Sequence, residues 1–180
     1  NDQAHPAIAR LKDHSMIVAW EDNTTDINTW GVFGRKMDKD GVPTGNVFQL
    51  NTTASGDQTQ VAVDALDKGF VAVWTSTQED SGDIMIGLFN DDGSKVQNKS
   101  EHFVTNAQTN LSETGVQHRA DVAALAGNRI VVVYEDTVTE GTGTGIYMQE
   151  FNSELEAVGQ ARNVNKTVKP GNQMWPSVRA

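Results

Sequence analysis

One pattern of residues occurs four times along this chain, and it restricts the possible folds more than any other feature. Each copy opens with a glutamine that is followed by a short, partly apolar segment. The four glutamines, Gln3, Gln58, Gln117 and Gln173, are 55, 59 and 56 residues apart. A chain with such a period folds into similar units that bury their apolar faces against their neighbours.

Within each unit, four short apolar runs follow one another in the same order. The second run ends on an aromatic residue in every complete unit, at Trp20, Trp74 and Tyr134. The runs are rich in Val, Ile, Phe and Trp and are bounded by Gly, Asp and Asn, which favours strands over helices. The second run is apolar almost throughout and indicates a strand that is buried on both faces.

A four-stranded antiparallel unit with this period predicts the blade of a β-propeller. We therefore expect an all-β, propeller-like fold with three blades, at 1–56, 57–115 and 116–171, and the first strand of a fourth at 172–180. A sandwich or a row of stacked sheets is the alternative. Because propeller rings close with about four to eight blades, three units predict a fragment of a longer protein or half of a ring that two copies complete.

Composition excludes several classes of protein. The 180 residues carry a formal charge of -10, whereas a nucleic-acid-binding face has to be basic. The absence of cysteine excludes disulfides, thiolate metal sites and cysteine nucleophiles. No apolar run approaches the roughly 18 residues of a membrane helix, and no signal peptide opens the chain.

An acidic loop is predicted after the second run of each unit, at 21–29, 75–83 and 135–145. Strand alternation brings these loops to the same rim as the ends of the fourth runs. Clustered carboxylates are ligands that Ca²⁺ prefers, although no EF-hand spacing is present, and a solvated acidic rim is the alternative. The candidate metal ligands are Glu21, Asp22, Asp26, Glu79, Asp80, Asp83, Glu135, Asp136 and Glu140.

Two tryptophans depart from the repeat pattern and are candidate ligand contacts. Trp30 has no aromatic counterpart, and Trp175 stands where the other units have His5, Gln60 and Arg119. An aromatic residue that is not repeated is a better candidate for stacking on a ligand than one that recurs in the core, although Trp175 packing on a further blade is the alternative. The asparagines on the same rim as the acidic loops complete the predicted ligand-binding set, which is Trp30, Trp175, Asn51, Asn106 and Asn165.

Catalysis is the less favoured interpretation. Propeller glycosidases need paired carboxylates, and a sialidase also needs an arginine cluster. Carboxylates are plentiful, but the six arginines form no triad in the repeat frame. We expect a non-catalytic binding or structural module whose long-loop face contacts a glycan, a protein or Ca²⁺. The alternatives are a propeller-type polysaccharide hydrolase or its accessory domain, and a self-assembling half-propeller that forms a homodimer.

The repeat resembles one found in very large exported bacterial proteins of the RTX and adhesin type. The resemblance covers nearly the whole chain and weakens in the third unit, where Tyr134 replaces tryptophan. It implies a propeller-like fold and secretion or display at the cell surface, but no activity. The calcium-binding nonapeptide of RTX proteins, Gly-Gly-x-Gly-x-Asp, is absent from this sequence. The residues that carry the resemblance are Gln3, Pro6, Leu11, Trp20, Gly41, Gln49, Asn51, Thr52, Thr53 and Gln58.

Overall fold

All regular elements in the described part of the chain are strands. The computed structural model describes residues 2–23, 29–78, 82–104, 116–137, 143–165 and 171–180. Its twelve strands form three four-stranded antiparallel sheets, one for each predicted unit. Within the described residues there is no helix with the length and apolar character that a membrane crossing needs.

The three sheets have the same strand order and nearly the same strand lengths. The first contains β1 (Gln3–Arg10), β2 (Met16–Asp22), β3 (Gly31–Met37) and β4 (Phe48–Gln49). The second contains β5 (Gln58–Ala65), β6 (Phe70–Ser76), β7 (Asp83–Phe89) and β8 (His102–Phe103). The third contains β9 (Gln117–Leu125), β10 (Arg129–Asp136), β11 (Gly145–Phe151) and β12 (Arg162–Asn163). In each sheet the strands lie side by side in chain order.

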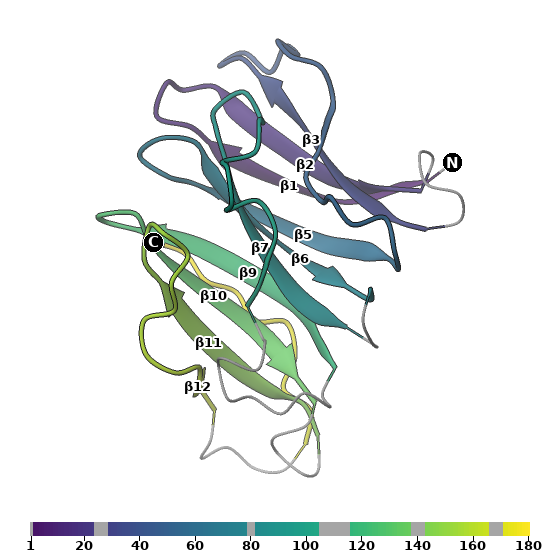
Figure 1. Ribbon diagram of the computed structural model, residues 1–180, viewed down its shortest axis with the longest axis vertical. Coiled ribbons are helices and arrows are strands. Elements are labelled where there is room, and N and C mark those ends of the chain that lie inside the picture. Colours follow the sequence, from purple (N-terminus) through teal and green to yellow (C-terminus); the bar gives the residue numbers. More distant parts are fainter. Residues whose placement is uncertain (1, 24–28, 79–81, 105–115, 138–142, 166–170) are drawn as a thin grey trace.

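The sheets are stacked face to face, with the first at one end and the third at the other (Figure 1). Their opening strands β1, β5 and β9 are neighbours in space, so they line the inner side of the stack. The fourth strands are only two residues long and lie on the outer edge of each sheet. Short outer strands expose few unpaired backbone groups, which limits unwanted pairing with other chains.

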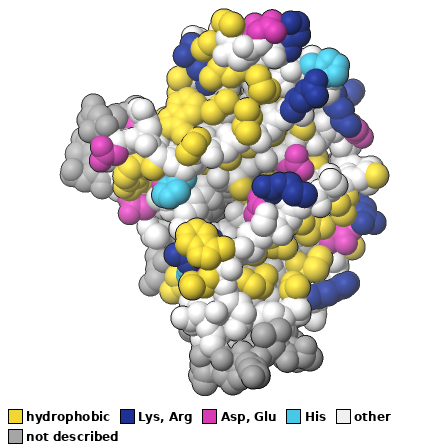
Figure 2. Space-filling model, turned by 180° about the vertical axis from the view of Figure 1, so that it is seen from behind, with side chains coloured by type: hydrophobic (Ala, Val, Ile, Leu, Met, Phe, Trp, Pro, Cys, Tyr) yellow, Lys and Arg dark blue, Asp and Glu magenta, His cyan; other side chains and the backbone are white. Residues whose placement is uncertain are grey.

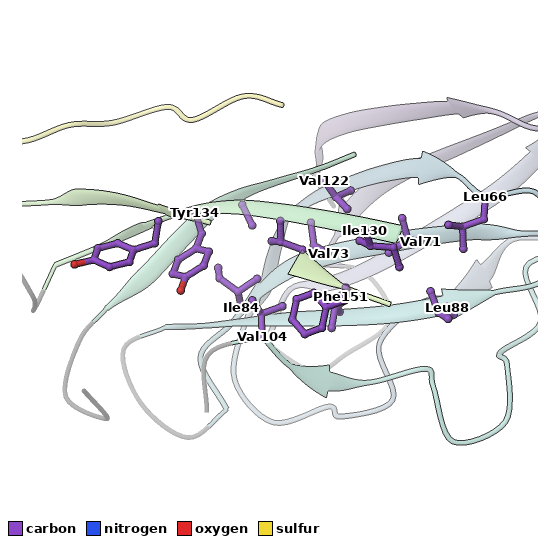
Figure 3. Close-up of a cluster of buried hydrophobic side chains, with 14 residues drawn as sticks. Leu66, Val71, Val73, Ile84, Leu88, Val104, Val122, Ile130, Tyr134 and Phe151 are labelled. Atoms are coloured by element: carbon purple, nitrogen blue, oxygen red, sulfur yellow. The ribbon is translucent and has the colours of Figure 1, made fainter. Parts of the chain in front are cut away.

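Two apolar cores hold the stack together. Between the second and third sheets, Val71 and Val73 of β6 pack with Val122, Ile130 and other buried side chains of the third sheet (Figure 3). Between the first and second sheets, the opposite side of β6 packs on β2 and β3. Because successive side chains of a strand point to opposite faces, one strand serves both cores.

The position of each second strand in the stack explains its burial. Every residue of β6 is buried, as the sequence predicts for a strand covered on both faces. In β2, Ile17 and Ala19 face the second sheet, whereas Met16, Val18 and Trp20 are only half-buried on the other face. Figure 2 shows hydrophobic side chains gathered over the upper part of the molecule, the end that the first sheet forms.

The strand bounds differ from the prediction at one point that matters for the site. The sequence places Glu21 and Glu135 in loops, but β2 and β10 continue through them as far as Asp22 and Asp136. The reason is that β2 pairs with β3 as far as Asp22, opposite Gly31. These carboxylates therefore belong to regular strands and not to long loops.

The start of the fourth unit is extended but is not part of a sheet. Residues 172–180 lie beside the third sheet, with the backbone N–H of Gln173 donating to the Thr144 carbonyl. The equivalent backbone bond joins the earlier units, because the N–H of Gln58 donates to the Trp30 carbonyl and the N–H of Gln117 donates to the Gly82 carbonyl. The segment thus occupies the place of an inner strand, although the described residues contain no second strand of its own unit to pair with it.

Repeat-equivalent tryptophans provide a test of this stacking. Trp74 is fully buried and donates its indole N–H to Gln58 Oε1 at 2.9 Å, whereas Trp20 lies on the open face of the first sheet. We expect Trp74→Ala to lower the free energy of unfolding by about 3–5 kcal/mol and Trp20→Ala by roughly 1 kcal/mol. Urea denaturation measures both. Equal losses would contradict the stacking order.

Candidate functional site

Each inner strand contains an irregularity at the same position of the repeat. The pairing of β1, β5 and β9 with their neighbours slips by one residue near His5, Gln60 and Arg119. These residues and Trp175, their equivalent in the fourth unit, all have left-handed backbone angles, with φ of 47°, 57°, 53° and 64° in chain order. We call the four residues the left-handed quartet.

The quartet is unusual because none of its members is a glycine. A residue with a side chain is strained at positive φ, by about 1–3 kcal/mol at an unfavourable position. At turns such as those of Gly41 and Gly69 the chain meets the same requirement with glycine. Among the described residues, the four other non-glycine residues with positive φ lie in turns, at His14, Asn98, Asn128 and Leu155.

A buried carboxylate connects the first unit to the second. Glu21, at the end of β2, accepts a hydrogen bond on Oε1 from the backbone N–H of Gln60. Its other oxygen lies 3.0 Å from Nδ1 of His5. The side chain of Glu21 is only 3% exposed, although that of His5 is 68% exposed, so the carboxylate itself is withdrawn from water. One carboxylate thereby holds two members of the quartet.

The third unit repeats this arrangement. Glu135 is fully buried and accepts the backbone N–H of Trp175 on Oε1 at 2.7 Å. Its Oε2 accepts a hydrogen bond from Nη1 of Arg119 at 2.9 Å and lies 3.0 Å from Nε2 of His118. Because the donors include a guanidinium, the buried charge of Glu135 is compensated.

The second unit reaches the same result with different residues. Thr75 stands where the other units have a glutamate, and its side chain is shorter. The Gln60 side chain takes over, because its Oε1 accepts both the backbone N–H of Arg119, at 2.8 Å, and the Thr75 hydroxyl, at 2.9 Å. We call these bonds, centred on Glu21, Gln60 and Glu135, the inter-unit links.

The quartet lines a pocket of about 600 Å³ on the inner side of the stack. Walls of the pocket come from all three sheets and from the C-terminal segment, which contributes Trp175, Ser177 and Arg179. Trp175 is the most exposed large apolar side chain there, with 71% of its surface accessible. One face of its ring is covered by the Arg119 guanidinium, 4.4 Å from the ring centroid, a cation–π contact.

Burial changes the protonation of one group beside the pocket. Desolvation lowers the pKa of His118 below that of a free imidazole, and the nearby charge of Arg119 acts in the same direction. The carboxylate of Glu135 opposes this change without reversing it. The neutral imidazole is therefore favoured, and it donates to Glu135 as an uncharged group.

The structure separates the predicted metal ligands. Glu21 and Glu135 belong to the inter-unit links, and Asp22 and Asp136 lie 2.9 Å and 3.3 Å from the side-chain nitrogens of inner-strand glutamines. Asp83 opens β7. Within the described ranges, no three acidic or histidine side chains are grouped as a metal site requires. The remaining candidates, Asp26, Glu79, Asp80 and Glu140, lie outside the described residues, and calcium binding stays a prediction.

The predicted ligand contacts are also dispersed. Trp175 is in the pocket, whereas Trp30 precedes β3 and accepts the inter-unit bond from Gln58 on its backbone carbonyl. Asn51 and Asn165 cap the third strands, accepting the backbone N–H groups of Val32 and Ile146 on their side-chain oxygens. Asn106 lies outside the described residues. Of the four members of this set that the structure describes, only Trp175 lines the pocket.

Sequence reasoning does not single out the quartet as a group, although a signal is present. His5, Gln60, Arg119 and Trp175 align two residues after the invariant glutamine of the repeat and differ in type. Core positions of a repeat keep the size and polarity of their side chains from unit to unit, so a position that varies in both is a candidate for ligand contact. What the sequence does not reveal is the left-handed backbone and the buried carboxylates behind it.

Comparison with known proteins identifies the fold. No protein-family model matches the chain, and no curated protein sequence matches it. Among solved structures, an α-L-arabinanase of Penicillium chrysogenum complexed with arabinobiose matches 93% of this chain with a TM-score of 0.62 and 16% identity. A thermostable family-43 glycoside hydrolase matches 96% with a TM-score of 0.57 and 13% identity.

A third similar structure is the haemagglutinin-neuraminidase ectodomain of parainfluenza virus 5, with a TM-score of 0.60, 8% identity and 94% of this chain covered. This chain spans 50%, 62% and 46% of the three proteins in the order given. The glycoside hydrolases are propeller enzymes, so the all-β, propeller-like class predicted from the repeat is confirmed. At these identities the similarity concerns the fold alone.

The inter-unit links predict a graded loss of stability. Glu21→Ala leaves the buried N–H of Gln60 without an acceptor, which costs about 1–3 kcal/mol. Glu21→Gln keeps an acceptor oxygen and is expected to cost less. Urea denaturation of both variants checks the order, with Glu156→Gln, an exposed carboxylate in the turn after β11, as the control. A Glu21→Ala variant as stable as the wild type would contradict the structural role of the link.

The lowered pKa of His118 predicts a dependence of stability on pH. The unfolded chain takes up a proton near the ordinary histidine pKa of about 6.5, whereas folded His118 takes it up only at lower pH. The unfolded state thus binds more protons in this window, and the folded state loses stability as the pH falls from 7 towards 5. In His118→Gln this dependence is expected to be weaker, as measured by urea denaturation across the range. His102→Gln, at an exposed site, is the control.

Proposed function

We propose that this chain is a non-catalytic carbohydrate-binding module and that the quartet-lined pocket is its binding site. The single observation that carries the proposal is the quartet, in which four different side chains project from four equivalent, strained backbone positions around one pocket. Strained backbone tends to cluster at ligand sites, where the surrounding structure holds it in place. A purely structural role would be served by glycine.

The chemistry of the pocket suits a sugar. Saccharides combine apolar C–H faces with hydroxyl groups, and they bind to sites that combine an aromatic platform with a few placed polar groups. Trp175 supplies the exposed platform, and Gln60 and Arg119 supply polar groups beside it. The arabinanase that shares the fold was solved with arabinobiose, which supports a saccharide as the ligand.

The carboxylates argue for binding and against hydrolysis. Glycosidases use one carboxylate as a general acid and another as a base or nucleophile, both facing the scissile bond. The two glutamates beside this pocket are buried, and both oxygens of each already accept hydrogen bonds from the inter-unit links. Glutamates engaged in this way hold the residues of the quartet in place and are not available to react with a substrate.

The repeat's resemblance to exported bacterial proteins supports a location outside the cell or at its surface. A binding site there would hold the protein on a polysaccharide. Arabino-oligosaccharides are the first probes, together with a panel of other plant and bacterial oligosaccharides. No release of reducing sugar is expected from any of them.

Replacing Trp175 by glycine tests the proposal without endangering the fold. Glycine accepts the left-handed backbone of this position. The relief of about 1–2 kcal/mol of strain offsets the cost of about 0.4–1 kcal/mol that a flexible glycine adds through the unfolded chain, so Trp175→Gly is expected to change the stability little. The loss of the aromatic platform is expected to weaken binding by at least about tenfold, which corresponds to 1.4 kcal/mol. Isothermal titration calorimetry with the oligosaccharide that binds best measures the change.

Asn98→Gly is the matched control, because Asn98 has a similar φ of 59° but lies in an exposed turn away from the pocket. It is expected to leave binding unchanged. The proposal is wrong if no member of the panel binds the wild-type chain, or if Trp175→Gly and Asn98→Gly bind equally well.

A further inference from the structure

The geometry points to a carboxylate-bearing sugar, a hexuronic acid, as the class of ligand that the pocket selects. This inference rests on the proposed function and specifies it further. Its basis is that the acceptor oxygens of Gln60 and Asp121 are engaged within the protein, whereas two guanidinium groups beside them keep donors available.

Gln60 illustrates the pattern. Its Oε1 accepts two hydrogen bonds, from the Arg119 backbone and from the Thr75 hydroxyl. An amide with its oxygen fixed in this way has its Nε2 fixed as well, and Nε2 can only donate. Among the described residues this nitrogen has no hydrogen-bond partner, so Gln60 presents a pair of N–H donors.

The acidic side chain in the pocket wall is occupied on both oxygens. Asp121 Oδ1 accepts the backbone N–H of Val122 at 3.0 Å. Its Oδ2 accepts from the Ser177 hydroxyl, from the backbone N–H of Val178 and from Nη1 of Arg179, at 3.1, 3.0 and 2.8 Å. Both oxygens of Asp121 are therefore occupied, and the residue offers little acceptor capacity to the hydroxyl groups of a sugar.

The guanidinium groups retain unused donors. Arg119 bonds Glu135 through Nη1, while its buried Nε has no partner within the described part of the chain. A guanidinium carries five N–H donors; the buried Nε of Arg119 is out of reach of a ligand, so the donors left after the bond to Glu135 are those of its two terminal nitrogens. Arg179 is 77% exposed and adds a second guanidinium to the same pocket.

Donors without competing acceptors select a ligand that is rich in acceptors. A neutral sugar hydroxyl both donates and accepts, and the oxygens of Gln60 and Asp121 that its donor side could use are already occupied. A carboxylate only accepts, and it pairs with guanidinium groups through short, charge-assisted hydrogen bonds. The uronic acid ring still stacks on Trp175 through its C–H face, as a neutral sugar does.

The test compares three α-1,4-linked trisaccharides that differ only at carbon 6 of each residue, namely trigalacturonic acid, its methyl ester and galactotriose. Isothermal titration calorimetry at fixed ionic strength measures the dissociation constants. We expect the acid to bind at least about tenfold more tightly than the ester or galactotriose, the value of one charge-assisted hydrogen bond.

Two variants locate the effect. Arg179→Gln, at an exposed position, is expected to weaken binding of the acid alone, by about threefold to tenfold. Arg119→Gln is expected to remove the preference for the acid. Near-ultraviolet circular dichroism checks its fold, because Arg119 also compensates Glu135. Arg129→Gln is the control, since Arg129 is an arginine outside the pocket that pairs with Glu150, and it is expected to change nothing.

The outcomes separate this inference from the proposed function. If the three probes bind equally, or if the neutral probe binds best, the preference for a carboxylate is wrong and carbohydrate binding stands. If neither these probes nor the wider panel bind, both are wrong. A preference for the acid that Arg119→Gln and Arg179→Gln leave intact would place recognition elsewhere and overturn the assignment to this pocket.

Discussion

The packing of one sheet's apolar face on the next is the constraint on which the rest of this structure depends. A single sheet of this size has two apolar faces and no interior of its own, so its stability comes from its neighbours. The middle sheet has both faces covered, and β6 is buried along its whole length. This stacking brings β1, β5 and β9 together, and the pocket exists only because three inner strands meet there.

Much of the fold follows from local patterns, and these were readable from the sequence. The length and composition of runs such as Phe70–Trp74 predict buried strands because a strand covered on both faces has no polar side. The spacing of the glutamines gives the number of units. The error at Glu21 and Glu135 has a physical reason, since a charged residue usually marks the end of a buried strand, and here the charge is matched by donors from a different unit.

The site was only partly predictable because it depends on contacts between units. Trp175 could be identified as an exception to the repeat, and it does line the pocket. The roles of Glu21 and Glu135 require knowing which backbone N–H lies opposite each carboxylate, and the strand register determines that. The acidic residues that look alike in the sequence have different partners in the structure. Asp22 and Asp136 contact inner-strand glutamines, whereas Glu21 and Glu135 accept backbone N–H groups of the next unit.

The substitution of Gln60 for a glutamate in the second link has a consequence for changing what this module binds. Position 175 is the one most open to exchange, because Glu135 holds its backbone, whereas the side chains of His5 and Arg119 contact the buried glutamates. Position 60 differs, because its side chain lines the pocket and also accepts the backbone N–H of Arg119, which holds the next inner strand. A library that randomises the pocket should vary position 60 only together with Thr75, where a glutamate would take over the link and release position 60 for recognition.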